Sequence, residues 1–245
     1  MRVKDEKHFC IYVAGHTIAV QTLFTDTYAL CKEYLCNDDP EQEICIREED
    51  IILERIETEK MNVSRRDGYL ETLAVYRKIS ELMLSYDTFL MHGAVIATGQ
   101  NAAYMFAANS GEGKTTHVQK WLEKAEKSFV VNGDKPLIKI TDAQAIACGT
   151  PWCGKEHLGA KVMVPLKAIV LMERGEDNVI QEITFGKAFT LLLQQTYRPA
   201  DAEKMRKTLV LLSMLKNRVH FYQFWFNNLK PNAFEVAYTA LTGQK

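Results

Sequence analysis

A glycine-rich segment in the middle of the chain constrains the fold more than any other feature. It reads ANSGEGKT over residues 108–115 and matches the phosphate-binding pattern G-x-x-x-x-G-K-[ST], except that Ala108 stands where the first glycine is expected. The apolar residues 104–107 before it predict a buried strand. After it, apolar residues recur at the spacing of one helix face: Val118, Trp121, Leu122 and Ala125.

A loop between a strand and a helix directs several backbone N–H groups and the positive end of the helix toward one point, which suits a polyphosphate. Within this loop Lys114 supplies a point charge, and the hydroxyl of Thr115 is available to magnesium. The residues predicted to bind the nucleotide are Asn109, Ser110, Gly111, Glu112, Gly113, Lys114, Thr115 and Thr116.

The composition is that of a globular protein and gives no support for a nucleic-acid-binding function. The 245 residues suffice for one large domain or two small ones, and 47% hydrophobic with 25% charged residues is ordinary for a globular protein. The formal net charge is -1, from 30 basic and 31 acidic residues, so no electrostatic argument favours a nucleic-acid partner.

The cysteines and the N-terminal sequence predict a cytoplasmic location. The six cysteines include no C-x-x-C pair and no zinc-ligand spacing, which favours thiols in a reducing compartment. Residues 1–9 are charged without an apolar stretch, so they do not resemble a signal peptide. No apolar run approaches the roughly 18 to 20 residues that cross a bilayer, and we expect no membrane partner.

The first part of the chain predicts a small sheet followed by helices. Two strand patterns within residues 8–23 meet at Gly15, which suits a hairpin turn. Glu41 to Glu59 holds eight acidic and two basic residues, which we interpret as the solvated edge of a sheet rather than a metal site. A helix is expected from Asp67 to Ser85; its Glu71 and Arg77 either form part of a substrate wall or face solvent.

Three polar residues beyond this helix are candidates for chemistry. His92 interrupts an apolar strand that pairs with the strand before the phosphate loop; it is either a core histidine bonded to the backbone or a group beside the phosphates. Asp134 follows a buried strand, where a carboxylate holds magnesium or polarises a hydroxyl, although a turn aspartate is the alternative. Lys155, in a Gly- and Pro-containing loop, is either a second cation for a phosphoryl group or an exposed lysine.

The order of four segments resembles a known family. These segments are Met91-His92-Gly93-Ala94, the phosphate loop, Val131-Asn132-Gly133-Asp134-Lys135-Pro136 and Gly149-Thr150-Pro151-Trp152. Their order resembles the C-terminal domain of HPr serine kinase/phosphorylase and its small relatives, which share a P-loop fold with ATP-dependent phosphoenolpyruvate carboxykinase. The resemblance spans roughly Ser85 to Asn178.

The resemblance implies an α/β fold of this P-loop type, with mixed, largely antiparallel sheets flanked by helices. We expect residues 1–85 to form a small α+β lobe, and residues 86–245 to form the kinase core with C-terminal helices. The family likeness also suggests association into a homo-oligomer.

The implied activity is an ATP- and Mg²⁺-dependent transfer of the γ-phosphoryl group to a hydroxyl. By the resemblance, Lys114 holds the β- and γ-phosphates, Thr115 and Asp134 bind magnesium, and His92 matches the histidine of the family's His-Gly strand. The predicted catalytic residues are His92, Asp134 and Lys155. The sequence departs from the family at Gly133, where the first acid of an Asp-Asp pair is expected.

The acceptor stays open at the level of sequence. A free amino acid or polyol is slightly favoured over a serine in a peptide or protein, because nothing resembles a peptide-recognition module. Gly133 also permits a nucleotide-binding regulatory or scaffold protein that transfers nothing. A structural protein with a coincidental glycine loop is the third alternative.

Overall fold

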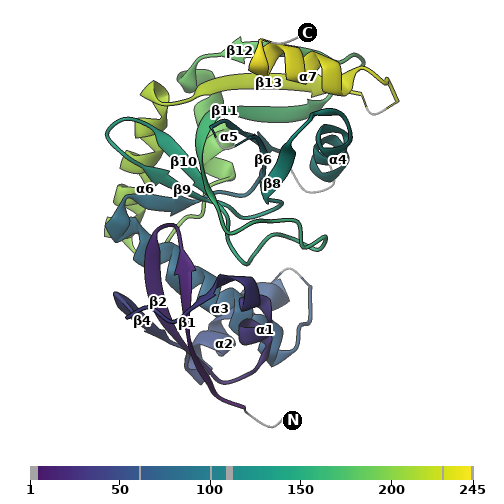
Figure 1. The fold of residues 1–245 in the computed structure, drawn as a ribbon. Coiled ribbons are helices and arrows are strands. Elements are labelled where there is room, and N and C mark those ends of the chain that lie inside the picture. The colour runs from purple at the N-terminus through teal and green to yellow at the C-terminus, as the bar shows by residue number, and fades with distance from the viewer. Residues whose placement is uncertain (1–4, 61, 100, 109–112, 228, 244–245) are drawn as a thin grey trace. The chain divides into compact units, whose positions relative to one another are not determined.

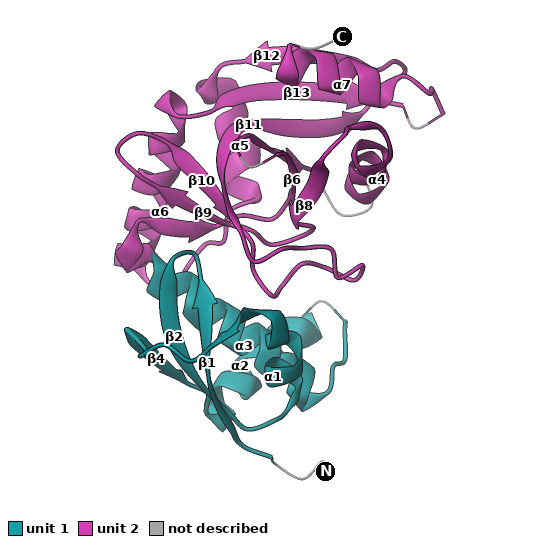
Figure 2. Ribbon diagram, viewed as in Figure 1, with its two compact units in different colours: residues 1–83 teal, residues 84–245 magenta. Residues whose placement is uncertain are grey.

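A computed structural model describes residues 5–60, 62–99, 101–108, 113–227 and 229–243. The chain forms two compact units, Met1–Met83 and Leu84–Lys245 (Figure 2). In the part of the chain that is described, no helix is both long enough and apolar enough to cross a bilayer.

Unit 1 combines one sheet with three helices. The four-stranded sheet has the order β3-β1-β2-β4. Its elements are β1 (Lys7–Val13), β2 (His16–Thr22), α1 (Asp26–Leu30), η1 (Lys32–Tyr34), β3 (Leu35–Cys36), β4 (Gln42–Cys45), α2 (Glu48–Lys60) and α3 (Asp67–Leu82). The predicted hairpin is confirmed: β1 and β2 are antiparallel, and Gly15 in their turn has φ 92°.

The acidic segment that we interpreted as a sheet edge is divided between β4, an edge strand of the sheet, and helix α2, so the interpretation was wrong for the larger part, α2. Its first turn carries acidic residues, which the positive end of a helix favours. Two of its carboxylates are paired with α3: Arg77 Nε lies 2.8 Å from Glu54 Oε1, and Lys78 Nζ lies 2.7 Å from Asp50 Oδ2. These ion pairs therefore help to hold α2 against α3.

Glu71 joins α3 to the turn after β2. Its carboxylate is fully buried and accepts the N–H of Leu23 at 2.5 Å and the N–H of Phe24 at 3.2 Å. Burial raises the pKa of Glu71 to about 7, although these hydrogen bonds favour the ionised form. Glu71 and Arg77 are both engaged within unit 1, so neither supports the substrate-wall hypothesis.

Unit 2 is built on a nine-stranded mixed sheet. Seven of its strands have the order β5-β9-β10-β11-β7-β6-β8; the other two are β13, which pairs with β11, and β12, which pairs with β13. Its strands are β5 (Thr88–Leu90), β6 (Ala94–Thr98), β7 (Ala103–Ala107), β8 (Ser128–Asn132), β9 (Leu137–Ile140), β10 (Ala145–Cys148), β11 (Met163–Arg174), β12 (Val179–Ile183) and β13 (His220–Phe226). β11 is parallel to β7 and β13, whereas the other neighbours are antiparallel.

Helices cover both faces of this sheet (Figure 1). They are α4 (Lys114–Lys124), α5 (Phe185–Gln194), α6 (Ala202–Met214) and α7 (Ala233–Thr242). Alternate strand residues pack on opposite faces: Met105 joins the core under α5 and α6, and Phe106 joins the core under α4 and α7. A mixed α/β architecture with mixed sheets and flanking helices is therefore confirmed.

The last two helices begin at or shortly after residues that favour a helix start. Asp201 caps α6, since its side chain accepts the N–H of Lys204 at 2.9 Å, and aspartate is a preferred residue at this position. α7 begins at Ala233, two residues after Pro231.

The register of three strands decides where the polar candidates lie. β6 runs antiparallel to both β7 and β8, with Ala94 opposite Phe106 and Val95 opposite Asn132. The start of β6 and the ends of β7 and β8 therefore share one edge of the sheet. Residues before β6, after β7 and after β8 converge there.

Candidate functional site

The phosphate-loop pattern lies between β7 and α4, as the sequence predicts. α4 begins at Lys114, and its N-cap Gly113 has φ 95°, a conformation that glycine adopts at little cost. The first four residues predicted to bind the nucleotide lie outside the described residues: Asn109, Ser110, Gly111 and Glu112.

Ala108 occupies the position of the first glycine in the pattern. Its side chain is buried in the same apolar cluster as Phe106 and Val118. Its carbonyl oxygen accepts a hydrogen bond from Lys114 Nζ at 2.7 Å. Thr115 is an exposed residue in the first turn of α4.

The inner face of α4 differs from the expected pattern at two positions. Leu122 is 38% exposed, whereas His117 is buried and packs against Phe106 and Phe224. Burial lowers the pKa of His117 to about 3, and its Nε2 accepts a hydrogen bond from Trp121 Nε1 at 3.0 Å. His117 is thus a neutral core residue, which the helical apolar pattern did not reveal.

Asn132, at the end of β8, builds the turn that carries Asp134. Its Oδ1 accepts the N–H of Asp134 at 2.9 Å and the N–H of Lys135 at 2.6 Å. Its Nδ2 donates to the carbonyl oxygen and to Oγ1 of Thr150, at 3.1 and 2.9 Å. The Thr150 hydroxyl donates to Lys135 O at 2.8 Å. Sequence reasoning missed both residues, although an asparagine two positions before an aspartate is a turn signal.

His92 and Asp134 form the polar centre of this edge. His92 Nε2 lies 3.1 Å from Asp134 Oδ1, and Lys135 Nζ lies 3.5 Å from Asp134 Oδ2. Burial opposes ionisation of Asp134, but the hydrogen bond from His92 and the charge of Lys135 outweigh it, and the pKa lies below its usual range. The side chains of His92 and Asp134 remain 36% and 28% exposed, so a carboxylate is available to a ligand at neutral pH.

Backbone hydrogen bonds fix the segment that holds His92. Gly93 N–H donates to Asp134 O at 2.8 Å, and Met91 N–H donates to Pro136 O at 3.2 Å. A Cβ on Gly93 would lie 2.9 Å from Phe106 O. Glycine therefore allows the segment to approach β7 closely.

The loop after β10 explains the glycine that departs from the family pattern. Gly133 N–H donates to Leu158 O at 2.9 Å, and a Cβ on Gly133 would lie 2.8 Å from Cys153 O. An aspartate at position 133 requires this loop to move. Gly154, with φ 89°, lies beside Asp134, and Lys155 follows it as an exposed residue.

Replacement of Gly133 by alanine should lower the free energy of unfolding of unit 2 by about 1–3 kcal/mol, because a backbone oxygen must move to admit the methyl group. Gly186→Ala is the matched control, since the nearest atom to its Cβ would be Thr184 Oγ1 at 4.0 Å. Denaturant unfolding followed by tryptophan fluorescence measures both. Equal unfolding midpoints for Gly133→Ala and the natural chain would contradict the tight fit.

Two oxygen-bearing side chains predicted for the site have the chemistry that magnesium held jointly with a phosphate would require. Among the described residues there is no cluster of three or more His, Cys, Asp or Glu able to hold a metal by themselves. Mg²⁺ is commonly bound by one or two protein oxygen groups together with substrate phosphates and water. The hydroxyl of Thr115 and the carboxylate of Asp134 match that chemistry.

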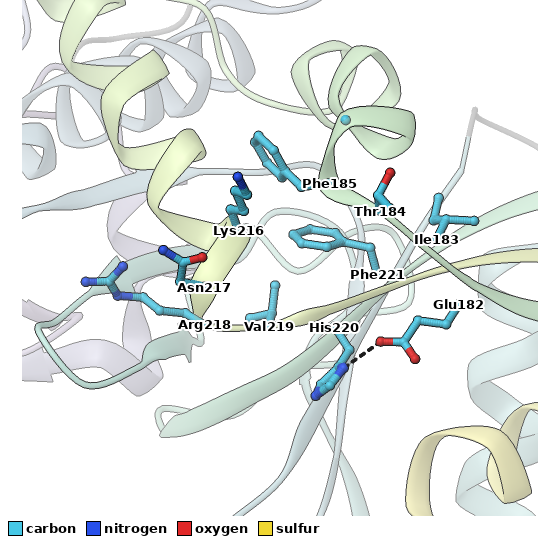
Figure 3. Close-up of a pocket in the computed structure, with 11 residues that line it drawn as sticks. Glu182, Ile183, Thr184, Phe185, Lys216, Asn217, Arg218, Val219, His220 and Phe221 are labelled. Atoms are coloured by element: carbon cyan, nitrogen blue, oxygen red, sulfur yellow. Dashed lines mark hydrogen bonds and ion pairs between the residues drawn. The ribbon is translucent and has the colours of Figure 1, made fainter.

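A separate surface cavity of about 900 Å³ lies at the N-terminus of α5 (Figure 3). It is lined partly by Phe185 and Phe221, with His220 Nδ1 2.7 Å from Glu182 Oε1. None of the residues predicted for the site lines this cavity. The opposite end of α5 carries Gln195, which contacts His92.

Comparison with known proteins does not define a family for the chain. No protein-family model matches the sequence, and no curated protein matches it. Among solved structures, the Hpr(Ser) kinase/phosphatase from Coxiella burnetii is similar at 8% sequence identity with a TM-score of 0.38. The match covers 62% of this chain and 95% of that chain.

Proposed function

We propose that the chain binds MgATP at the loop between β7 and α4 and transfers the γ-phosphoryl group to a hydroxyl. The observation that carries this proposal is the His92–Asp134 pair, 3.1 Å apart, at the sheet edge where β7 ends in the phosphate-loop pattern. The fold type proposed is that of the P-loop kinases related to HPr kinase, and the sequence motifs support it.

Each residue has a distinct part in the proposed reaction. Lys114 binds the β- and γ-phosphates as a point charge. Asp134 accepts the proton of the acceptor hydroxyl, or contributes an oxygen to the metal, and His92 orients its carboxylate through Oδ1. Magnesium, when bound, neutralises phosphate charge, and Thr115 and Asp134 are the residues to hold it. Lys155 is a proposed further cation.

The proposed acceptor is a small hydroxyl compound, an amino acid or a polyol, and a serine in a peptide or protein is the alternative. Gly133 supports a second candidate function, a nucleotide-binding regulator without transfer, because the contact with Cys153 O leaves no room for a second acid there. Calorimetric titration with MgATP followed by a transfer screen separates the two, since a regulator binds without transferring. A cytoplasmic location and self-association remain predictions from the sequence.

Lys114→Ala should lower the rate of phosphotransfer by about 100-fold or more, because the phosphoryl group being transferred loses the stabilising positive charge of the lysine. Transfer is measured by ³¹P NMR with MgATP and a panel of amino acids, polyols and serine peptides. Lys124→Ala is the matched control: it lies on the same helix, and its partner Glu235 is exposed, so its ion pair contributes little. Undiminished transfer in Lys114→Ala would exclude this loop as the donor site.

A further inference from the structure

Gln195 contacts His92 at two points, neither of which has a role in the reaction proposed above. It is the C-cap of α5, immediately after the last helical residue. Its backbone oxygen accepts the N–H of His92 at 2.7 Å, and its side-chain Oε1 lies 2.9 Å from His92 Nδ1. One residue therefore contacts both the backbone and the ring of His92.

The chain around Gln195 is itself held by backbone pairing. Tyr197 N–H donates to Leu90 O at 2.9 Å, and Met91 forms an antiparallel bridge with Thr196. On its other side the His92 segment is bonded to the turn that carries Asp134. The His92 segment thus lies between two strand-like neighbours, one of which supplies Asp134 and the other Gln195.

The two ring nitrogens of His92 have separate partners. Nδ1 faces Gln195, and Nε2 faces Asp134 at 3.1 Å. A histidine ring rotates about two side-chain torsions, and a second hydrogen bond at the far nitrogen removes that freedom. The side chain of His92 is 36% exposed. If the contact at Nδ1 is removed, the contact of Nε2 with Asp134 is the one that remains of these two.

We infer that Gln195 is a positioning residue, which fixes the His92 ring through Nδ1 so that Nε2 points at the Asp134 carboxylate. Its catalytic consequence rests on the proposed phosphotransfer, whereas its effect on the ring does not. Gln195 is 103 positions from His92 in sequence. No motif marks it, and only the fold brings it to the site.

Three variants of the full chain test this inference. Gln195→Met keeps the length of the side chain and removes the amide. Gln195→Glu keeps an acceptor oxygen. Gln194→Met is the matched control, because Gln194 is the exposed neighbour on the same helix end. A ring N–H is seen by NMR only when a hydrogen bond slows its exchange. ¹⁵N-histidine labelling, with assignment through His92→Gln and with Nδ1 distinguished from Nε2 by their different couplings to the ring carbons, therefore reports the Nδ1 contact.

The expected result is a protected N–H at Nδ1 of His92 in the natural chain, in Gln194→Met and in Gln195→Glu, and its loss in Gln195→Met. The same loss should lower kcat about 10- to 100-fold with little change in the KM for MgATP, since the ring is misplaced rather than the nucleotide. Gln195→Glu should lose less turnover than Gln195→Met. In a double-mutant cycle, Gln195→Met should add nothing to His92→Gln.

Persistence of the Nδ1 signal in Gln195→Met would overturn the inference. So would full turnover in Gln195→Met alongside an active natural chain, or an additive double mutant. If the natural chain transfers no phosphate to any acceptor, the proposed function fails, and the Nδ1 signal still decides whether Gln195 positions His92.

Discussion

Asp134→Asn should lower kcat for phosphotransfer by about 10²- to 10⁴-fold, the usual contribution of a positioned general base. Asparagine keeps the size of the side chain and its ability to hydrogen-bond with His92, 3.1 Å away, but removes the negative charge. The depressed pKa of Asp134 means that this charge is present at neutral pH in the natural protein. The measurement is the initial rate of transfer at saturating MgATP, together with calorimetric affinity for MgATP.

The two readouts also divide the roles proposed for Asp134. A fall in kcat at unchanged MgATP affinity assigns the carboxylate as base, and a fall in both assigns it as a metal ligand. Asp142→Asn is the matched control, because Asp142 is an exposed aspartate in the turn between β9 and β10. Unchanged turnover in Asp134→Asn would remove Asp134 from the mechanism.

Asn132→Ala should destabilise unit 2 by about 3 kcal/mol, because it removes a buried side chain that makes four hydrogen bonds. Two acceptor oxygens of Thr150 and the backbone N–H groups of Asp134 and Lys135 then lose these partners. Because the turn also sets the position of Asp134, turnover should fall as well. The reason is geometric, since Asn132 need not contact any substrate.

Fluorescence gives this experiment a selective readout. All three tryptophans, Trp121, Trp152 and Trp225, belong to unit 2, so their emission follows the unfolding of that unit alone. Asn101→Ala, at an exposed asparagine, is the control and should leave the midpoint unchanged. An unaltered denaturation midpoint for Asn132→Ala would show that the hydrogen-bond network around the turn contributes little.

Part of the candidate site was predictable from the sequence because its signals are local. The phosphate-loop pattern, the apolar strand before it and the helix after it occupy consecutive residues, and the same holds for Asp201 as a helix cap. Composition identified the acidic segment but not its structure. Charge alone does not distinguish a solvated strand from a helix, and α2 was therefore missed.

Which side chains contact each other within the candidate site could be determined only from the tertiary structure. The sequence placed His92, the phosphate loop and Asp134 in order along the chain, but gave no reason for His92 to contact Asp134 rather than the core. That contact follows from the register of β6 between β7 and β8. The absence of an acid at Gly133 likewise has its reason in a backbone oxygen of a loop twenty residues away, Cys153 O.

The sequence by itself determined the strand and the helix on either side of a phosphate-loop pattern, the proposed donor half of the site, since each of those signals is read from neighbouring residues. The tertiary structure alone decided the other half, in which Asn132 builds the turn of Asp134 and Gln195 holds His92. The physical reason is that these contacts join residues distant along the chain. Strand register and loop packing fix such contacts, and local patterns carry no information about either.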